Sequence, residues 1–153
     1  MRSLFAAALI ASISTTSTLA QTIEIIPNGS KASAVGQPGQ FSGQVVINPL
    51  FPATEDTLST IGEVTFAPGA RTVWHTHPAG QLLMVTSGKG WVQQHGEARR
   101  EISSGDAVWI PAGVKHWHGA TATTAMRHTA VSYMRDGKNV DWLEPVSDEQ
   151  YRR

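Results

Sequence analysis

Two histidines separated by one residue, His75 and His77, are the first feature of the sequence that could do chemistry. On an extended strand, side chains at positions i and i+2 point to the same face, so both imidazole rings can reach one metal ion. Such a pair also occurs by chance, and alone it is a weak indication. The chain contains no cysteine, which leaves histidine, carboxylate, amide or water as metal ligands and excludes thiol chemistry.

The residues around the pair form a longer pattern with glycine and proline at defined positions. The first stretch reads Gly69, five residues, His75, one residue, His77, three residues, Gln81, six residues and Gly88. The second stretch reads Gly105, five residues, Pro111, Ala112, Gly113, two residues and His116. The two stretches resemble the paired motifs of the cupin superfamily in spacing and in residue type. The resemblance implies an all-β fold, a single-domain antiparallel β-barrel or jelly roll that encloses a metal ion.

In cupins, two histidines and a carboxylate of the first motif and one histidine of the second bind the metal. This pattern maps the ligands onto His75, His77, Gln81 and His116. Gln81 replaces the usual glutamate, which removes a negative charge, makes the ion a stronger Lewis acid and weakens its retention. In the alternative, which stays open, Gln81 is a bystander and three histidines hold the metal. Imidazole with oxygen suits Mn, Fe, Zn, Ni or Cu as the one divalent ion.

A closer resemblance covers nearly the whole chain from about Phe41 onward. Its segments are residues 66–81, 115–120, 123–128, 141–144 and 148–153. They are similar to small bacterial manganese-dependent cupins with hydroxynitrile lyase activity. The resemblance implies manganese as the metal, and an enzyme that cleaves cyanohydrins to an aldehyde and cyanide or forms them from these products.

Two further histidines that serve the chemistry in that group map onto His118 and His128. The sequence pattern agrees, because His118 lies two residues after His116, and His128 shares a period-2 face with Met126 and Ala130. We interpret His128 as the general base and His118 as a hydrogen-bond donor to departing cyanide. The alternative for each is a neutral histidine hydrogen-bonded in the core. His95 precedes Gly96 in an expected turn, and we expect it to be exposed.

Three positions of the expected pocket leave the substrate open. Ser132 stands where the lyases carry a glutamine, and the small residues Gly62 and Val64 line the same presumed cavity. Two other functions fit the same metal site. One is a metal-dependent dioxygenase of the quercetinase type, for which iron or copper and a glutamate would be typical. The other is a non-catalytic cupin that binds a small molecule.

The rest of the chain supplies short strands that would position these residues. From Phe41, we expect strands at 41–48, 60–67, 71–76, 80–86, 89–95, 106–110, 115–118 and 124–134, separated by turns. A short C-terminal helical segment is expected after Ser147 as N-cap. We assign the cupin domain to residues 41–153, and an N-terminal edge strand at Ile23–Ile26 with a following loop to residues 21–40.

Residues 1–20 have the pattern of a secretory signal peptide. Arg2 provides the positive start, and an apolar run precedes small polar residues that end at Ala20, where we expect cleavage. The expected location is therefore the periplasm or the exterior. The formal net charge is zero, so we expect neither nucleic acid nor membrane as a partner after cleavage, but a small-molecule substrate. We also expect a homo-oligomer, a dimer or tetramer, with Ile23–Ile26 as one sheet edge.

Overall fold

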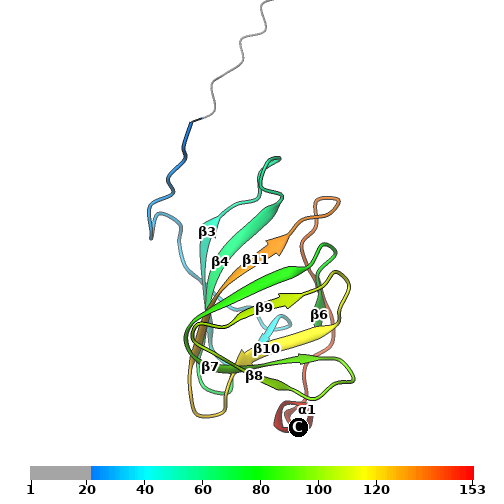
Figure 1. The fold of residues 1–153 in the computed structure, drawn as a ribbon. Helices are drawn as coiled ribbons and strands as arrows, with labels where there is room; N and C mark the ends of the chain where they lie inside the picture. Colours follow the sequence, from blue (N-terminus) through cyan, green and yellow to red (C-terminus); the bar gives the residue numbers. More distant parts are fainter. Residues whose placement is uncertain (1–21) are drawn as a thin grey trace, which may run out of the picture.

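The computed structural model describes residues 22–153 and confirms the expected all-β fold with one short C-terminal helix (Figure 1). The predicted signal peptide, residues 1–20, lies outside the described residues. The strands are β1 (Ala34–Val35), β2 (Phe41–Ser42), β3 (Val45–Phe51), β4 (Ser59–Phe66), β5 (Arg71–Thr72), β6 (His75–Thr76), β7 (Gln81–Gln94), β8 (Arg100–Ser103), β9 (Ala107–Ile110), β10 (His116–Ala120), β11 (Met126–Tyr133) and β12 (Asp141–Trp142). The helix is α1 (Asp148–Arg152).

The strands form one curled antiparallel sheet in the order β1-β3-β4-β11-β7-β10-β5-β2. Off this path, β8 and β9 pair with β7, while β6 pairs with both β10 and β12. Strand β7 is shared by the two halves of the barrel, because its first residues pair with β9 and β11 and its last residues pair with β8 and β10. Strands that carry the two histidine motifs are therefore brought to one end of one barrel.

The sequence predicted two strands at 80–86 and 89–95 with a turn between them, and this prediction was wrong. The chain instead runs through as the 14-residue β7, with a bulge opposite Arg127 and His128. Gly88 has φ of 75°, a left-handed conformation that glycine adopts without strain. At Gly90, a Cβ atom would lie 2.2 Å from the Gly119 carbonyl oxygen. The glycines that looked like a turn thus bend one long strand and let β10 and β11 approach it.

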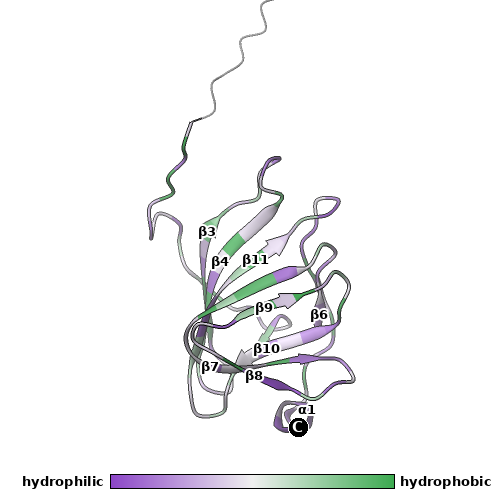
Figure 2. Ribbon diagram, in the orientation of Figure 1, coloured by the Kyte–Doolittle hydropathy of each residue, from purple (hydrophilic) through white to green (hydrophobic). Residues whose placement is uncertain are grey.

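The core has two parts, one inside the barrel and one beneath the helix. Figure 2 shows hydrophobic stretches on β4 and β7 and hydrophilic residues on β8 and α1. The barrel core is built from Val45, Phe66, Ala70, Val85, Ile102, Ala120 and Met126. The second cluster consists of Trp74, Trp117, Val146 and Tyr151. The C-terminal segment is therefore packed onto the barrel.

The helix begins as predicted at Ser147, whose side chain accepts a hydrogen bond from the Gln150 backbone in a capping box. Three contacts fix the helix to the barrel. Tyr151 donates its hydroxyl to the Ala120 carbonyl at 2.8 Å, Arg71 lies 2.8 Å from the Asp148 carboxylate, and the Arg71 guanidinium lies over the Tyr151 ring.

The N-terminal segment differs from the expectation. Ile23–Ile26 form no strand in the single chain, and Ile23 and Ile25 are 94% and 81% exposed. The strand in this stretch is the two-residue β1, which pairs with β3. Strands β8 and β12 were not predicted, because their sequences carry no clear alternation. Within residues 22–153, no helix has the length and apolar character that crossing a membrane requires.

Candidate metal centre

The three predicted ligands of the first motif lie 35 to 41 residues before His116 in the sequence, and the two motifs meet because β6 pairs directly with β10. His75 and His116 are register partners, and their ring centroids are 4.1 Å apart. The His77 ring, in the turn after β6, lies 5.1 Å from the His75 ring and 5.5 Å from the His116 ring. All three side chains are buried, as is that of Gln81 at the start of β7. The structure therefore brings the four predicted ligand residues together.

Each of these three imidazoles is oriented by a backbone carbonyl. The Nδ1 atom of His75 lies 3.0 Å from the Val73 oxygen, and that of His116 lies 2.9 Å from the Val114 oxygen. The Nδ1 atom of His77 contacts the Asn139 oxygen. A carbonyl can only accept, so in all three rings Nδ1 carries the proton and Nε2 keeps a free lone pair. This is the arrangement that metal-binding histidines use.

Buried acceptor atoms remain at the centre of this group. In the described part of the chain, His77 Nε2, His116 Nε2 and Gln81 Oε1 are buried without a hydrogen-bond partner. A buried acceptor without a donor costs free energy unless a cation or donor satisfies it. Imidazole nitrogens and an amide oxygen together suit a divalent transition-metal ion. The residues present therefore fit the metal that the motifs predict.

The orientation of Gln81 is set by its cross-strand partner on β11. Gln81 and Ser132 are in register, and Gln81 Nε2 donates to Ser132 Oγ at 3.0 Å in a buried contact. Because the amide nitrogen is engaged there, the amide oxygen faces the other way, toward the imidazoles. Ser132 thus holds Gln81 with its amide oxygen toward the imidazoles.

A second grouping of the histidines is also compact. One ring nitrogen from each of His75, His116 and His118 lies within 4.8 Å of the others, and this three-histidine cluster fits a divalent metal site. The third member in this grouping is His118 in place of His77. The environments of the two rings differ. His77 is oriented by a carbonyl, as His75 and His116 are, whereas His118 is oriented by another imidazole.

His118 and His128 form a hydrogen-bonded pair beside the cluster. His128 Nε2 lies 3.3 Å from His118 Nδ1, and their ring centroids are 4.9 Å apart. Phe66 packs against both rings. One proton is shared along this contact, because one nitrogen must donate and the other accept. The two predicted catalytic histidines are therefore one connected unit rather than two separate groups.

Burial lowers the pKa of all five histidines of the site. It lowers the pKa of His116 and of His128 to about 4. Burial, followed by the charge of His128, holds the pKa of His118 well below 6.5, and burial followed by the charge of His116 does so for His75. Burial also lowers the pKa of His77, against the effect of the Asn139 carbonyl. The imidazoles are therefore neutral near pH 7, and their unprotonated ring nitrogens are available to bind a cation.

A cavity of about 180 Å³ opens onto these groups. As predicted, Gly62 and Val64 line it, together with Ser132. Its remaining wall is largely apolar and includes Phe41 and Trp142, whose rings lie 5.7 Å apart. Sites for drug-sized molecules usually exceed about 300 Å³, so this cavity suits a small, mostly apolar molecule.

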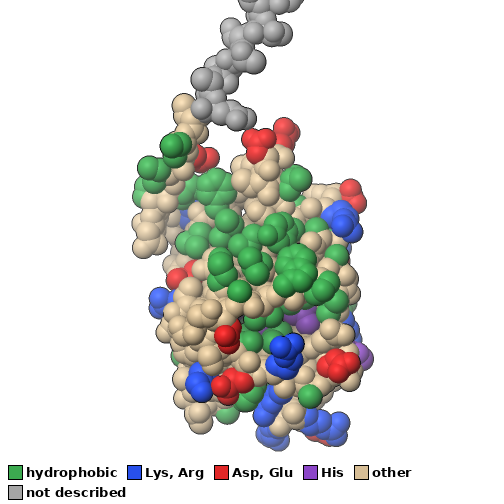
Figure 3. Space-filling view, viewed as in Figure 1, with side chains coloured by type: hydrophobic (Ala, Val, Ile, Leu, Met, Phe, Trp, Pro, Cys, Tyr) green, Lys and Arg blue, Asp and Glu red, His purple; other side chains and the backbone are tan. Residues whose placement is uncertain are grey.

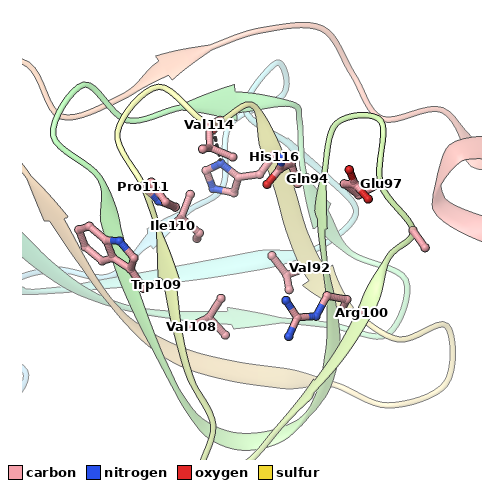
Figure 4. A pocket seen from close by; sticks show the side chains of 11 residues that line it. Val92, Gln94, Glu97, Arg100, Val108, Trp109, Ile110, Pro111, Val114 and His116 are labelled. Atoms are coloured by element: carbon pink, nitrogen blue, oxygen red, sulfur yellow. Dashed lines mark hydrogen bonds between the residues drawn. The ribbon is translucent and has the colours of Figure 1, made fainter.

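A larger cavity of about 360 Å³ lies on the other side of His116, between β8 and β9 (Figure 4). Its walls include Val92, Val108 and Ile110, with Arg100 and Glu97 also lining it. His116 is the only histidine that lines it. The smaller cavity, lined by His75, His77, His118 and His128, is the one in which these groups could act on a molecule.

The sequence did not indicate the contribution of the segment after β11. Asn139 orients His77 through its carbonyl and donates its side chain to Thr60 at 2.8 Å. Trp142 is the register partner of His75. Neither residue lies in a histidine motif. The one indication in the sequence that this segment matters was the family resemblance at residues 141–144, which include Trp142. His95 is exposed, as predicted.

Comparisons with known proteins identify the family of the chain. The cupin domain pattern matches residues 62–132. A relative from Granulicella tundricola, named (R)-mandelonitrile lyase, is 56% identical over 131 residues, which cover 86% of this chain and all of the relative. The chain belongs to the cupin family.

Solved structures share the fold. A cupin-like protein from Thermotoga maritima is 38% identical and matches with a TM-score of 0.73 over 84% of this chain and 95% of that chain. A polyketide cyclase from Streptomyces resistomycificus is 18% identical and matches with a TM-score of 0.64 over 86% of this chain and 92% of that chain. The second match shows the common fold alone.

Acid should destabilise the metal-free protein. In the unfolded chain a histidine binds its proton near pH 6.5, whereas in the folded chain His116 and His128 bind theirs at about pH 4. The unfolded state therefore takes up more protons between these values, and stability falls as the pH falls. From these two histidines alone, we expect a loss of roughly 3 kcal/mol between about pH 7.5 and pH 5.5. Urea unfolding of chelator-treated protein at several pH values measures this, and a flat profile would contradict the neutral buried imidazoles.

Removing the Ser132 hydroxyl should weaken metal binding without removing a ligand. In Ser132→Ala the Gln81 amide loses its fixed partner, and we expect metal affinity to fall roughly tenfold, as for other groups that orient ligands. Ser132→Thr keeps a hydroxyl and serves as the matched control, with affinity near wild type. Competition against a chelating dye measures the affinities. Equal affinity of the alanine variant and wild type would show that Ser132 does not orient Gln81.

Proposed function

We propose that the chain is a metal-dependent lyase that cleaves cyanohydrins to an aldehyde and cyanide and catalyses the reverse addition. The observation that carries the proposal is the hydrogen-bonded pair of His118 and His128, which shares a small cavity with the buried ligand set. The relative named (R)-mandelonitrile lyase supports the same activity. The small apolar cavity favours a cyanohydrin with a compact aromatic or aliphatic substituent.

His75, His77, Gln81 and His116 would hold one divalent ion, for which we propose manganese. The bound ion supplies Lewis acidity toward a substrate oxygen. A neutral ligand set leaves the full charge of the ion available for this purpose. Cyanohydrin cleavage changes no oxidation state of a metal, so it needs neither an oxidant nor a reductant.

The chain's own residues handle the proton. In the cleavage direction, His128 takes the proton of the substrate hydroxyl as general base. The bond to the nitrile carbon then breaks with its electron pair on cyanide, and the hydroxyl oxygen becomes the aldehyde carbonyl. His118 hydrogen-bonds the departing cyanide. Because His118 and His128 are in contact, the proton can pass along the pair to the cyanide, and hydrogen cyanide leaves with the aldehyde.

Loss of the base should stop turnover without loss of the metal. In His128→Ala we expect kcat/KM for aldehyde release from racemic mandelonitrile to fall by at least about 100-fold, the range of general-base catalysis. His95→Ala is the matched control, because it removes an exposed histidine that does not line the cavity, and its activity should stay near wild type. Mass spectrometry of bound metal on the same samples checks that the site is loaded equally.

Three outcomes would contradict parts of the proposal. Unchanged turnover in His128→Ala would remove this residue as the base. Absence of aldehyde release from wild type loaded with manganese would reject the lyase activity. Native protein that carries iron or copper and consumes oxygen would favour a dioxygenase of the quercetinase type on the same ligands.

A further inference from the structure

The chain between β11 and β12 forms one wall of the small cavity. Asn139, Val140 and Trp142 line the cavity from this side. The turn before them, residues 135–138, is exposed, and Figure 3 shows charged side chains at the tip of this turn, beyond β11. The first and last residues of the turn exchange backbone hydrogen bonds of 2.8 and 3.0 Å. These bonds close the turn on itself, so the position of the wall depends on the residues that follow the turn.

Asn139 contacts two parts of the barrel at once. Its side-chain amide donates to Thr60 Oγ1 on β4 at 2.8 Å. Its backbone carbonyl accepts the hydrogen bond of His77 Nδ1, in the turn between β6 and β7. In the described part of the chain, the bond to Thr60 is the one hydrogen bond that a side chain of residues 135–140 donates to a strand of the sheet. The amide thus ties the carbonyl of the same residue to β4.

His77 differs in this respect from the two other histidines of the predicted ligand set. The rings of His75 and His116 contact carbonyls that lie two residues earlier in their own segments. The carbonyl that His77 contacts lies 62 residues later in the chain. Local backbone geometry therefore orients two of the rings, whereas the third ring depends on where a separate segment is held.

The carbonyl controls the protonation of the ring as well as its direction. As long as Nδ1 of His77 donates to the carbonyl, Nε2 keeps the lone pair that a metal ion needs. If the carbonyl moved away, the ring could turn and the proton could lie on Nε2, where it blocks metal binding.

We propose that Asn139 is a positioning residue for the metal ligand His77, because its side chain, held by Thr60, fixes the carbonyl that orients the imidazole. The inference rests on the metal-binding role given to His77 and does not depend on the substrate. It makes metal retention a property of the cavity wall, since Thr60 and Asn139 both line the cavity.

Manganese affinity, measured by competition against a chelating dye, tests the inference. Thr60→Val removes the acceptor hydroxyl with little change in side-chain size, and Asn139→Leu removes the donor. We expect each substitution to raise the manganese dissociation constant roughly tenfold, as for other groups that orient metal ligands. The double variant should lose no more affinity than either single variant, because both substitutions remove the same hydrogen bond. Thr60→Ser keeps the hydroxyl and should bind manganese as wild type does.

Val140→Ala is the matched control for a role in the cavity wall alone. Val140 lines the same cavity from the same segment, but its side chain has no polar atom that could hold the carbonyl. This substitution should change the KM for racemic mandelonitrile and leave the manganese affinity near wild type.

Nuclear magnetic resonance of the zinc-loaded protein reports on the ring directly. In wild type, the Nδ1 protons of His75, His77 and His116 are all held by carbonyls and should exchange slowly with water. In Thr60→Val and Asn139→Leu, the His77 proton should exchange faster, whereas the other two should stay slow.

Circular dichroism melts confirm that each variant is folded. Tenfold losses of affinity in both single variants, with no further loss in the double variant, support the inference. Wild-type affinity in both single variants would overturn it, as would additive losses in the double variant. An equal loss in Val140→Ala would also overturn it and would assign the effect to packing of the wall. Wild type that binds no manganese would reject the ligand set and this inference with it. Failure of the lyase activity would leave the expected affinities unchanged, so the two proposals are tested separately.

Discussion

The hydrogen bonds that fix the buried imidazoles are the constraint on which the rest of the structure depends. Three neutral imidazoles can face one buried centre as metal ligands when Nδ1 of each ring donates to a backbone carbonyl and Nε2 keeps its lone pair. The acceptors are the carbonyls of Val73, Val114 and Asn139, which belong to three segments that are distant in sequence. The carbonyls of Val73 and Val114 lie two residues before the rings that they contact, whereas closing the barrel so that β6 lies between β10 and β12 brings the Asn139 carbonyl to His77. The orientation of the three imidazoles therefore depends on both the local motifs and the closure of the barrel.

Strand β11 places some of its side chains in the site and others on the opposite face of the sheet. Its inward residues, His128 and Ser132, contact His118 and Gln81 respectively, whereas its outward residue Val131 pairs with Ile61 on β4 and with Leu82 on β7. The strict alternation of a strand keeps these roles apart, since a shift of one residue would exchange them. Register along β7 and β11 thus fixes which residues enter the site.

Much of the site could be predicted from the sequence, because the residues that the structure brings together lie in two motifs whose spacing is typical of short strands joined by turns. Gln81 does begin a strand, and His118 and His128 do face the cavity. The contacts between residues could not be predicted. The hydrogen bonds of Asn139 with His77 and of Ser132 with Gln81 depend on pairings between segments more than 50 residues apart.

The continuous β7 was missed because Gly88 and Gly90 are residues typical of a turn. The structure instead requires glycine there because neighbouring backbone packs closely against both positions. The strand predicted at Ile23–Ile26 does not form in the single chain, because an apolar pattern alone does not show whether a neighbouring strand edge is available.

The ligand set is the central claim, and crystallography of the metal-loaded protein at the manganese absorption edge tests it most directly. The account predicts one anomalous peak at about 2.0–2.3 Å from the Nε2 atoms of His75, His77 and His116 and from Oε1 of Gln81, with His118 outside bonding distance. A peak bonded to His118 in place of His77 would contradict the account, because the pair that handles the proton would then be part of the metal site. A peak with Gln81 turned away would leave the three histidines as the ligands and remove the role given to Ser132.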